Sequence, residues 1–295
     1  MIGIDDVRAA AARIKGHVRH TPMLEASALG SPLTADAQVT LKLELLQVTG
    51  SFKARGATNR LLSMQPAELA KGIVAASGGN HGIATARAGR MAGVPTTIFL
   101  PTNASPAKIE KLKHWGAETR IVGSVWHEAN AAALEFVART GAAYFHPFAD
   151  PYVVAGQGTV GLEILEQLPD VDTVLVAMGG GGLVSGVATA IKASRPSVRV
   201  IGIEAQGSAV LLRALEAGRN IGLDEVTPRS PPWPAPRPMT PFSRSSATRW
   251  MTSSWSMIPK CSAPPLPVSG AMCGARRCSR PARWGRSSPP THRSP

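Results

Sequence analysis

Cysteine and long apolar runs are scarce in this chain of 295 residues. The first 225 residues contain no cysteine, and no apolar run is long enough to cross a membrane. The amino terminus also lacks the pattern of a secretory signal. These absences exclude a membrane protein and a disulfide-stapled secreted domain, and they predict a protein of the reducing cytoplasm.

Acidic residues are missing from the last 70 positions. The whole chain has 32 lysines and arginines against 19 acids, but residues 1–225 have 21 against 19. The remaining segment has ten arginines and Lys260 with no acid, and it holds 15 of the 25 prolines. The positive charge therefore belongs to the tail, residues 226–295, and the composition changes abruptly after Glu225.

The tail shows neither helical nor strand periodicity, and its prolines exclude interior positions of both structures. We therefore predict that residues 226–295 are disordered. One interpretation is a nucleic-acid-binding arm, because arginine can contact phosphates and tryptophan can stack on bases.

A shifted reading frame is the preferred interpretation of the tail, because methionine and tryptophan have single codons and allow a partial test. Met239-Thr240 and Met251-Thr252 each force a stop codon in the frame that starts at second codon bases. In the frame that starts at third bases, Trp250-Met251-Thr252 forces two consecutive aspartates. A GC-rich codon choice there gives acidic sequence with helix and strand patterning.

Residues 1–225 alternate between short β-branched runs, which end in glycine, proline or polar turns, and helical segments. The clearest helix is residues 105–116, where Ser105 can cap, Pro106 suits the first turn and Gly116 ends the helix. This alternation predicts an α/β fold with parallel sheets covered by helices. The expected strands are residues 39–44, 72–79, 95–101, 118–123, 172–182 and 198–205.

A run of four glycines ends the fifth expected strand segment and precedes an expected helix. Such a turn presents bare backbone N–H groups and the positive end of a helix dipole to an anion. Val184 and Ser185 stand where a dinucleotide fingerprint needs its third glycine, and no Walker lysine follows. The pattern predicts a site for a single phosphate, and a merely flexible loop is the alternative.

Lys53 lies in "VTGSFKARGA", between a glycine turn and a helix start. An ordinary solvated lysine is one interpretation. A separately placed lysine together with a single phosphate site suggests pyridoxal phosphate, whose aldehyde needs an amine for a Schiff base. The stretch "ASGGNHG" adds Ser77, Asn80 and His81, which suit a carboxylate or a ring oxygen, although His81 alone is as readily structural.

Four stretches together resemble the serine/threonine dehydratase branch of the fold-type II pyridoxal phosphate enzymes: "TGSFKARGA", "SGGNHGIA", "YFHPFADPYVVAGQGTVGLEI" and "VAMGGGGLVSGVA". The resemblance runs from about Val7 to about Val226. It implies the two-lobed architecture of the tryptophan synthase β chain, with the cofactor between the lobes. The large lobe would comprise residues 1–74 and 150–225, incomplete at its C-terminal end, and the small lobe residues 75–149.

The resemblance also implies roles for individual residues. Lys53 would form the Schiff base, Phe52 would pack beside the cofactor, and Asn80 would bind the phenolic oxygen of its ring. The substrate carboxylate would be bound by Ser77, Gly79, Asn80 and His81. The cofactor phosphate would be bound by Gly179, Gly180, Gly181, Gly182 and Leu183.

The activity implied is β-elimination from L-threonine or L-serine, giving a 2-keto acid and ammonia. Gly78 stands where racemising relatives have a serine, which favours elimination, and a serine racemase-like enzyme is a less favoured alternative. Val210 stands where an aspartate would complete a cation site with Glu204, so no metal site is expected. The resemblance implies a homo-oligomer that binds a small amino acid, with no membrane or nucleic-acid partner. An inactive product of a disrupted gene and a basic nucleic-acid-binding protein are two further hypotheses.

Overall fold

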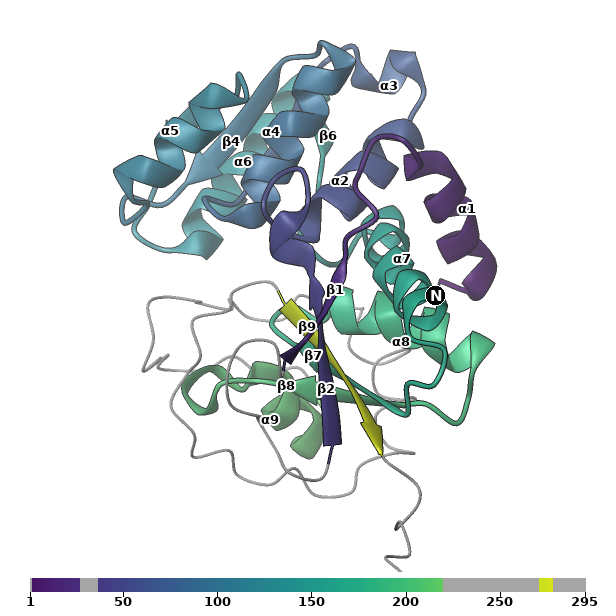
Figure 1. Ribbon diagram of the computed structural model, residues 1–295. Coiled ribbons are helices and arrows are strands. Elements are labelled where there is room, and N and C mark those ends of the chain that lie inside the picture. Colours follow the sequence, from purple (N-terminus) through teal and green to yellow (C-terminus); the bar gives the residue numbers. More distant parts are fainter. Residues whose placement is uncertain (1, 27–36, 220–270, 278–295) are drawn as a thin grey trace, which may run out of the picture.

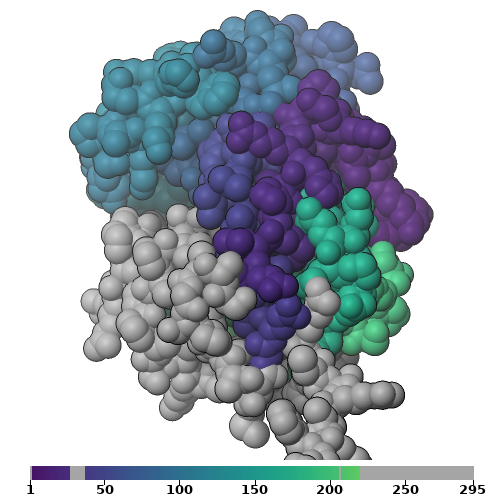
Figure 2. All heavy atoms as spheres, in the orientation of Figure 1, coloured from purple at the N-terminus to yellow at the C-terminus, as the bar shows by residue number. Residues whose placement is uncertain are grey.

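The computed structural model describes residues 2–26, 37–219 and 271–277, which form two β-sheets with helices packed around them (Figure 1). The predicted α/β class and two-lobed architecture are confirmed. Figure 2 shows the residues around the smaller sheet, in blue and teal, gathered at one end of the molecule. Within the described ranges, no helix has both the length and the apolar character needed to span a membrane.

The smaller sheet has the strand order β5-β4-β3-β6, and each neighbouring pair is parallel. Its strands are β3 (Ile73–Ala76), β4 (Thr96–Leu100), β5 (Glu118–Ile121) and β6 (Ala143–Tyr144). The helices around it are α4 (Asn80–Ala92), α5 (Pro106–His114) and α6 (Trp126–Thr140).

Strand β3 is apolar throughout because both of its faces are covered. Ile73 and Ala75 belong to the core that contains α4, whereas Val74 and Ala76 belong to the core that contains α6. Side chains of a strand alternate between its two faces, so a strand between two helical layers needs no polar positions. This arrangement is what the sequence predicted for a parallel sheet.

The larger sheet has the strand order β1-β2-β9-β7-β8. Its strands are β1 (Met23–Glu25), β2 (Ala37–Leu43), β7 (Thr173–Ala177), β8 (Arg199–Ile203) and β9 (Ala271–Arg277). Only β7 and β8 are parallel, and the other neighbouring pairs are antiparallel. The larger sheet is therefore mixed, which corrects the expectation of wholly parallel sheets.

Helices α7 (Pro151–Gln167) and α8 (Gly182–Ser194) form the main core of this region with β7, through Ile164, Val174 and Val187 among others. The remaining helices are α1 (Ile4–Ile14), α2 (Lys53–Leu62), α3 (Pro66–Leu69), α9 (Val210–Glu216) and the 3₁₀ helices Glu44–Leu46 and Gln206–Ser208. Helix α2 contacts both α4 and α7, so it joins the layers of the two sheets.

The structure confirms strands within all six expected segments, and it differs from the sequence prediction in three places. The expected lobe boundary between residues 74 and 75 falls inside β3, so we place it before Ile73. Strand β9 comes from the tail that composition predicted to be disordered. Ser105 precedes α5 as predicted, but its side chain makes no capping hydrogen bond.

Candidate active site

Lys53 is the first residue of α2, and the preceding turn fixes its position. Gly50 has a φ of 78°, in the left-handed region that favours glycine, and its N–H donates to the carbonyl of Gln47 at 2.7 Å. After Lys53, residues 54–59 are all buried. The lysine is therefore placed by a tight turn on one side and by a buried helix on the other.

The ammonium of Lys53 contacts no carboxylate among the described residues. Its Nζ donates to the carbonyl oxygen of Pro147 at 2.6 Å and lies 5.2 Å from the centre of the Phe52 ring. Burial, which disfavours the charged form, lowers the pKa of Lys53 to about 8. A lysine with a lowered pKa is a better nucleophile and base at neutral pH than an exposed one.

In the cofactor-free protein, Lys53 is expected to react with an amine-acylating reagent with a midpoint near pH 8. The neutral amine is the reactive form, and burial makes it appear at lower pH than in an ordinary exposed lysine. Lys53 also loses its proton at a lower pH in the folded protein than in the unfolded chain. Lys53 therefore makes folding more favourable as the pH rises from about 8 to the unfolded pKa. Site-resolved mass spectrometry measures the labelling of Lys53, and a midpoint near the ordinary lysine pKa of about 10.4 would contradict the prediction.

The second part of the site follows β3. Residues 77–79 lead from the strand into α4, and the Gly79 N–H donates to the Ser77 hydroxyl at 3.3 Å. A Cβ at position 82 would lie 1.9 Å from the Ser77 carbonyl oxygen, so this first turn of α4 requires glycine. No described contact involves the side chain of Asn80, and its predicted role stays a proposal.

His81 is the buried polar side chain of this turn, with 3% of its surface exposed. Its Nε2–H donates to the Phe145 carbonyl oxygen at 2.8 Å, and its Nδ1 has no hydrogen-bond partner in the part of the chain that is described. Burial, and then the charge of Lys53, lower the pKa of His81 to about 3. The imidazole is neutral, and Nδ1 is an acceptor that can bind a donor group of a ligand.

The third part of the site is the glycine turn between β7 and α8. Gly181 has a φ of 85° and precedes the first residue of α8. A Cβ on Gly180 would lie 2.3 Å from the Phe148 ring, so the approach of this ring excludes larger residues. The first amides of a helix have no partner within the helix, and those of Gly182 and Leu183 suit a phosphate.

Residues 145–149, between β6 and α7, bring these three parts together. The Phe145 carbonyl accepts from His81, and the Pro147 carbonyl accepts from Lys53. The Phe148 ring lies against Gly180. The sequence prediction included this stretch in the family resemblance but gave it no role. Its position after a strand end, like those of the other two turns, is the signal that could have identified it.

Several buried polar atoms around this region lack hydrogen-bond partners among the described residues. They are Thr49 Oγ1, Ser51 Oγ, His81 Nδ1, His146 Nε2 and Ser185 Oγ. Buried polar groups are nearly always satisfied, so these atoms indicate a ligand with donors and acceptors of its own. With one amine and one anion-binding turn, the residues present fit pyridoxal phosphate.

Glu204, the residue that matches the family's cation-binding glutamate, binds the start of α9 in this structure. Its carboxylate accepts from the N–H groups of Leu211 at 3.1 Å and Leu212 at 2.9 Å. Burial raises the pKa of Glu204, and these hydrogen bonds oppose that effect. Within the described ranges, no group of three or more His, Cys, Asp or Glu side chains could hold a metal ion.

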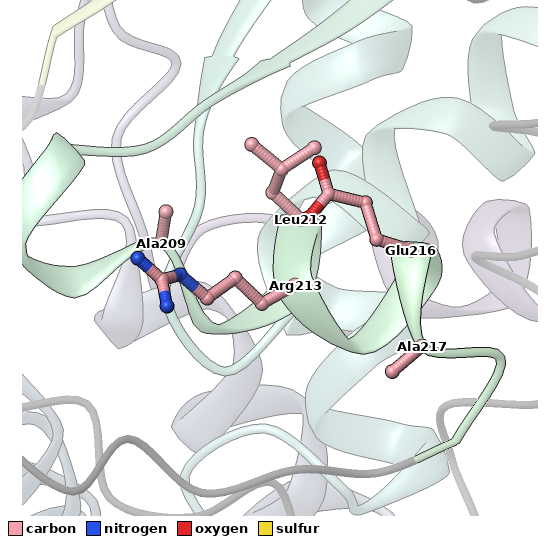
Figure 3. A pocket seen from close by; sticks show the side chains of 5 residues that line it. All are labelled: Ala209, Leu212, Arg213, Glu216 and Ala217. Carbon is pink, nitrogen blue, oxygen red and sulfur yellow. The ribbon is translucent and has the colours of Figure 1, made fainter.

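A cavity of about 670 Å³ lies on α9. Its lining residues are Ala209, Leu212, Arg213, Glu216 and Ala217. Figure 3 shows Leu212 and Glu216 extending side by side, while Arg213 extends toward Ala209. None of the predicted site residues lines this cavity, so we do not place the substrate there.

A family model described as "Pyridoxal-phosphate dependent enzyme" matches residues 14–249. The matched range extends past Val226, where the predicted resemblance ended, and the expectation that the tail is unrelated to the family stays a prediction. An L-threonine ammonia-lyase from Thermotoga maritima is 43% identical over 219 residues, which are 74% of this chain and 54% of that protein. The chain thus spans about half the length of the curated relatives it matches.

Solved structures show the same likeness. A T.th. threonine deaminase is 38% identical with a TM-score of 0.70, covering 76% of this chain and 71% of that one. A maize serine racemase is 35% identical with a TM-score of 0.72, covering 76% of this chain and 68% of the other. A protein named a threonine deaminase and one named a serine racemase therefore share this architecture.

Proposed function

Because the chain belongs to the pyridoxal-phosphate dependent enzyme family, we propose that it converts L-threonine or L-serine to a 2-keto acid and ammonia. The observation that carries the proposal is the meeting of an amine and an anion-binding turn at residues 145–149. Lys53 contacts Pro147, and the glycine turn contacts Phe148, the next residue. Adjacent Cα atoms are only about 3.8 Å apart, which supports a site shared by the amine and the glycine turn.

The residues divide into those that hold the cofactor and those that hold the substrate. Lys53 would bind the cofactor's aldehyde, Asn80 its phenolic oxygen, and the amides of residues 179–183 its phosphate. Residues 77–81 would bind the substrate carboxylate with their amides and side chains, at the start of α4. When bound, pyridoxal phosphate supplies an electron sink for the negative charge that develops at the substrate's α carbon.

Lys53 is the group that moves the proton. When its Nζ is not engaged with the cofactor, Lys53 would take the substrate's α proton, which requires the neutral amine. The lowered pKa of Lys53 provides that form near neutral pH. The β-hydroxyl group then leaves, and the water lost on elimination is regained on hydrolysis, so the net products are keto acid and ammonia.

A racemase is the second candidate, and the likeness to a maize serine racemase favours it. Racemisation needs a proton donor on the second face of the α carbon, and Gly78 offers no side chain there. A Cβ at this position would lie 3.1 Å from the Leu100 side chain, so space for a larger residue is limited. Elimination is therefore the reaction that this chain supports better.

Purified protein loaded with pyridoxal phosphate is expected to release ammonia and 2-keto acid from L-threonine in equal amounts. A coupled lactate dehydrogenase assay measures the keto acid. Chiral chromatography after incubation with L-serine measures D-serine, which is expected to be absent. Accumulation of D-serine without keto acid would favour the racemase. Absence of both products would favour an inactive chain.

Three further expectations stay predictions. The cytoplasmic location rests on the absence of cysteine from the first 225 residues. The homo-oligomeric state is implied by the family resemblance alone. Binding of nucleic acid is not expected, and salt-dependent binding of a DNA oligomer would contradict this.

A further inference from the structure

His146 lies in the middle of the loop that joins the three parts of the site, and the proposed reaction gives it no role. Its Nδ1 accepts hydrogen bonds from the backbone N–H groups of Phe148 at 3.3 Å and Ala149 at 2.9 Å. An atom that accepts from N–H groups carries a lone pair rather than a proton. The proton of the neutral imidazole is therefore on Nε2.

The Nε2–H group of His146 is a buried donor without a hydrogen-bond partner among the described residues. The carbonyls of the same loop already accept from other side chains, Phe145 from His81 and Pro147 from Lys53. The ring of Phe148 packs edge-on against the imidazole, with 4.7 Å between centroids. A buried donor left without an acceptor costs free energy, which makes this atom an exception in need of a cause.

The charge state of His146 limits the roles that its imidazole can have in the site. Burial, and then the charge of Lys53, lower the pKa of His146 to about 4, which leaves the imidazole neutral at physiological pH. A neutral imidazole gives up its remaining proton very reluctantly, so His146 is a poor general acid. The group can donate a hydrogen bond and hold an oxygen atom in place.

We propose that the Nε2–H of His146 donates a hydrogen bond to an oxygen atom of the ligand bound at Lys53. The oxygen belongs either to the cofactor or to the hydroxy amino acid. This inference rests on the proposed function, since that function defines the two ligands. His146 is then a binding residue that orients the ligand, while its Nδ1 keeps the loop in shape.

Two substitutions test the roles of the two ring nitrogens, Nδ1 and Nε2, separately. In His146→Asn, the side-chain oxygen can replace Nδ1 as the acceptor for the loop amides, but the donor toward the ligand is lost. In His146→Gln, the terminal amide can replace the Nε2–H donor, but the acceptor for the loop is lost. The pair therefore distinguishes a role in ligand binding from a role in loop structure alone.

The experiment titrates wild type and both variants with pyridoxal phosphate, followed by absorbance, and then adds L-threonine and records the spectral change. Neither reading requires turnover. We expect His146→Asn to weaken one of these affinities by about tenfold or more, while His146→Gln stays within about threefold of wild type. A loss of affinity for pyridoxal phosphate assigns the oxygen to the cofactor. A loss of affinity for L-threonine alone assigns it to the amino acid.

Thermal unfolding of the cofactor-free variants completes the test, and His146→Asn is expected to melt like wild type. Wild-type affinities for both ligands in His146→Asn, or a greater loss in His146→Gln than in His146→Asn, would overturn the proposal. A wild-type protein that binds no pyridoxal phosphate would instead overturn the proposed function, and this inference with it.

Discussion

Replacing Lys53 with alanine is expected to abolish the absorbance band of the bound cofactor and to lower keto acid formation by about a thousandfold or more. The variant would lose the group proposed both to bind the aldehyde and to take the α proton. Among the lysines with described hydrogen bonds, Lys53 alone contacts residues 145–149, so no other lysine is expected to replace it. Both functions therefore fail together.

Sodium borohydride makes the test specific. In wild-type protein, reduction is expected to bleach the band and to add the mass of the cofactor to the peptide that contains Lys53. The matched control is Lys108→Ala, at an exposed position on α5, which is expected to keep the band and the activity. A band that survives in Lys53→Ala and still labels the protein on reduction would count against the assignment.

The same variant separates function from folding. Burial disfavours the charged form of Lys53, so the folded protein gains little from this amine apart from one hydrogen bond to Pro147. Lys53→Ala is therefore expected to melt at or near the temperature of the cofactor-free wild type. A large loss of stability would mean that the lysine is primarily structural.

The local pattern of the sequence was enough for most of the fold. Strands such as β4 and β7 are short β-branched runs, and the segments after β3, β6 and β7 carry the candidate site. Strands β3 and β6 are parallel neighbours, so the segments that follow them meet at one edge of the smaller sheet, whereas β7 belongs to the larger sheet. The parallel sheet is also where the prediction was most accurate.

The loop of residues 145–149 was missed because its contacts with Lys53 and His81 use backbone carbonyls. Any residue supplies a carbonyl, so no side-chain pattern marks it. The strand β9 was missed for a related reason. The edges of β2 and β7 offer backbone donors and acceptors that a chain of any composition can pair with. The shifted-frame interpretation of the tail stays a prediction, and sequencing the coding DNA after the codon for Asp224 tests it.

A buried charge cluster behind Lys53 was also missed, since lysine and glutamate in an alternating strand ordinarily indicate a solvated face. Arg55 pairs with Glu44 at 2.7 Å and with Glu163 at 2.5 Å, and Lys42 pairs with Glu163 at 2.5 Å. These two cations and two carboxylates connect β2, the 3₁₀ helix Glu44–Leu46, α2 and α7. The cluster fixes α2, and hence Lys53, relative to its neighbours.

The pKa shifts of Arg55 and Glu163 show that pairing outweighs the cost of burial for these two groups. For Lys42, burial outweighs the pairing with Glu163 and lowers its pKa. Burial alone would raise the pKa of Glu163, but hydrogen bonds and charge from Arg55 and then Lys42 hold it below its ordinary value. Burial likewise lowers the pKa of Arg55, and the two carboxylates more than reverse this. A carboxyl with a lowered pKa stabilises the fold above its unfolded pKa, and this contribution is lost as the pH falls through the folded value.

Replacing Arg55 with methionine is expected to reduce the free energy of unfolding by about 3–5 kcal/mol, because it leaves a buried carboxylate without its cation. Glu163 keeps Lys42, whereas Glu44 keeps only the hydroxyl of Thr21 among its described hydrogen-bond partners. The double variant Arg55→Met with Glu44→Gln is therefore expected to recover much of the loss. Urea unfolding of the cofactor-free protein measures both effects.

The matched control for Arg55 is Arg8→Ala, which breaks an exposed pair with Asp5 and is expected to change stability little. The cofactor titration adds a second reading. Lys53 lies on α2 only two residues before Arg55. Arg55→Met is therefore expected to weaken pyridoxal phosphate binding even under conditions where the protein is still folded. The double variant is expected to bind pyridoxal phosphate more tightly than Arg55→Met does. The cluster does not hold the lysine in place if Arg55→Met is as stable as wild type. The same conclusion follows if the double variant is less stable than Arg55→Met.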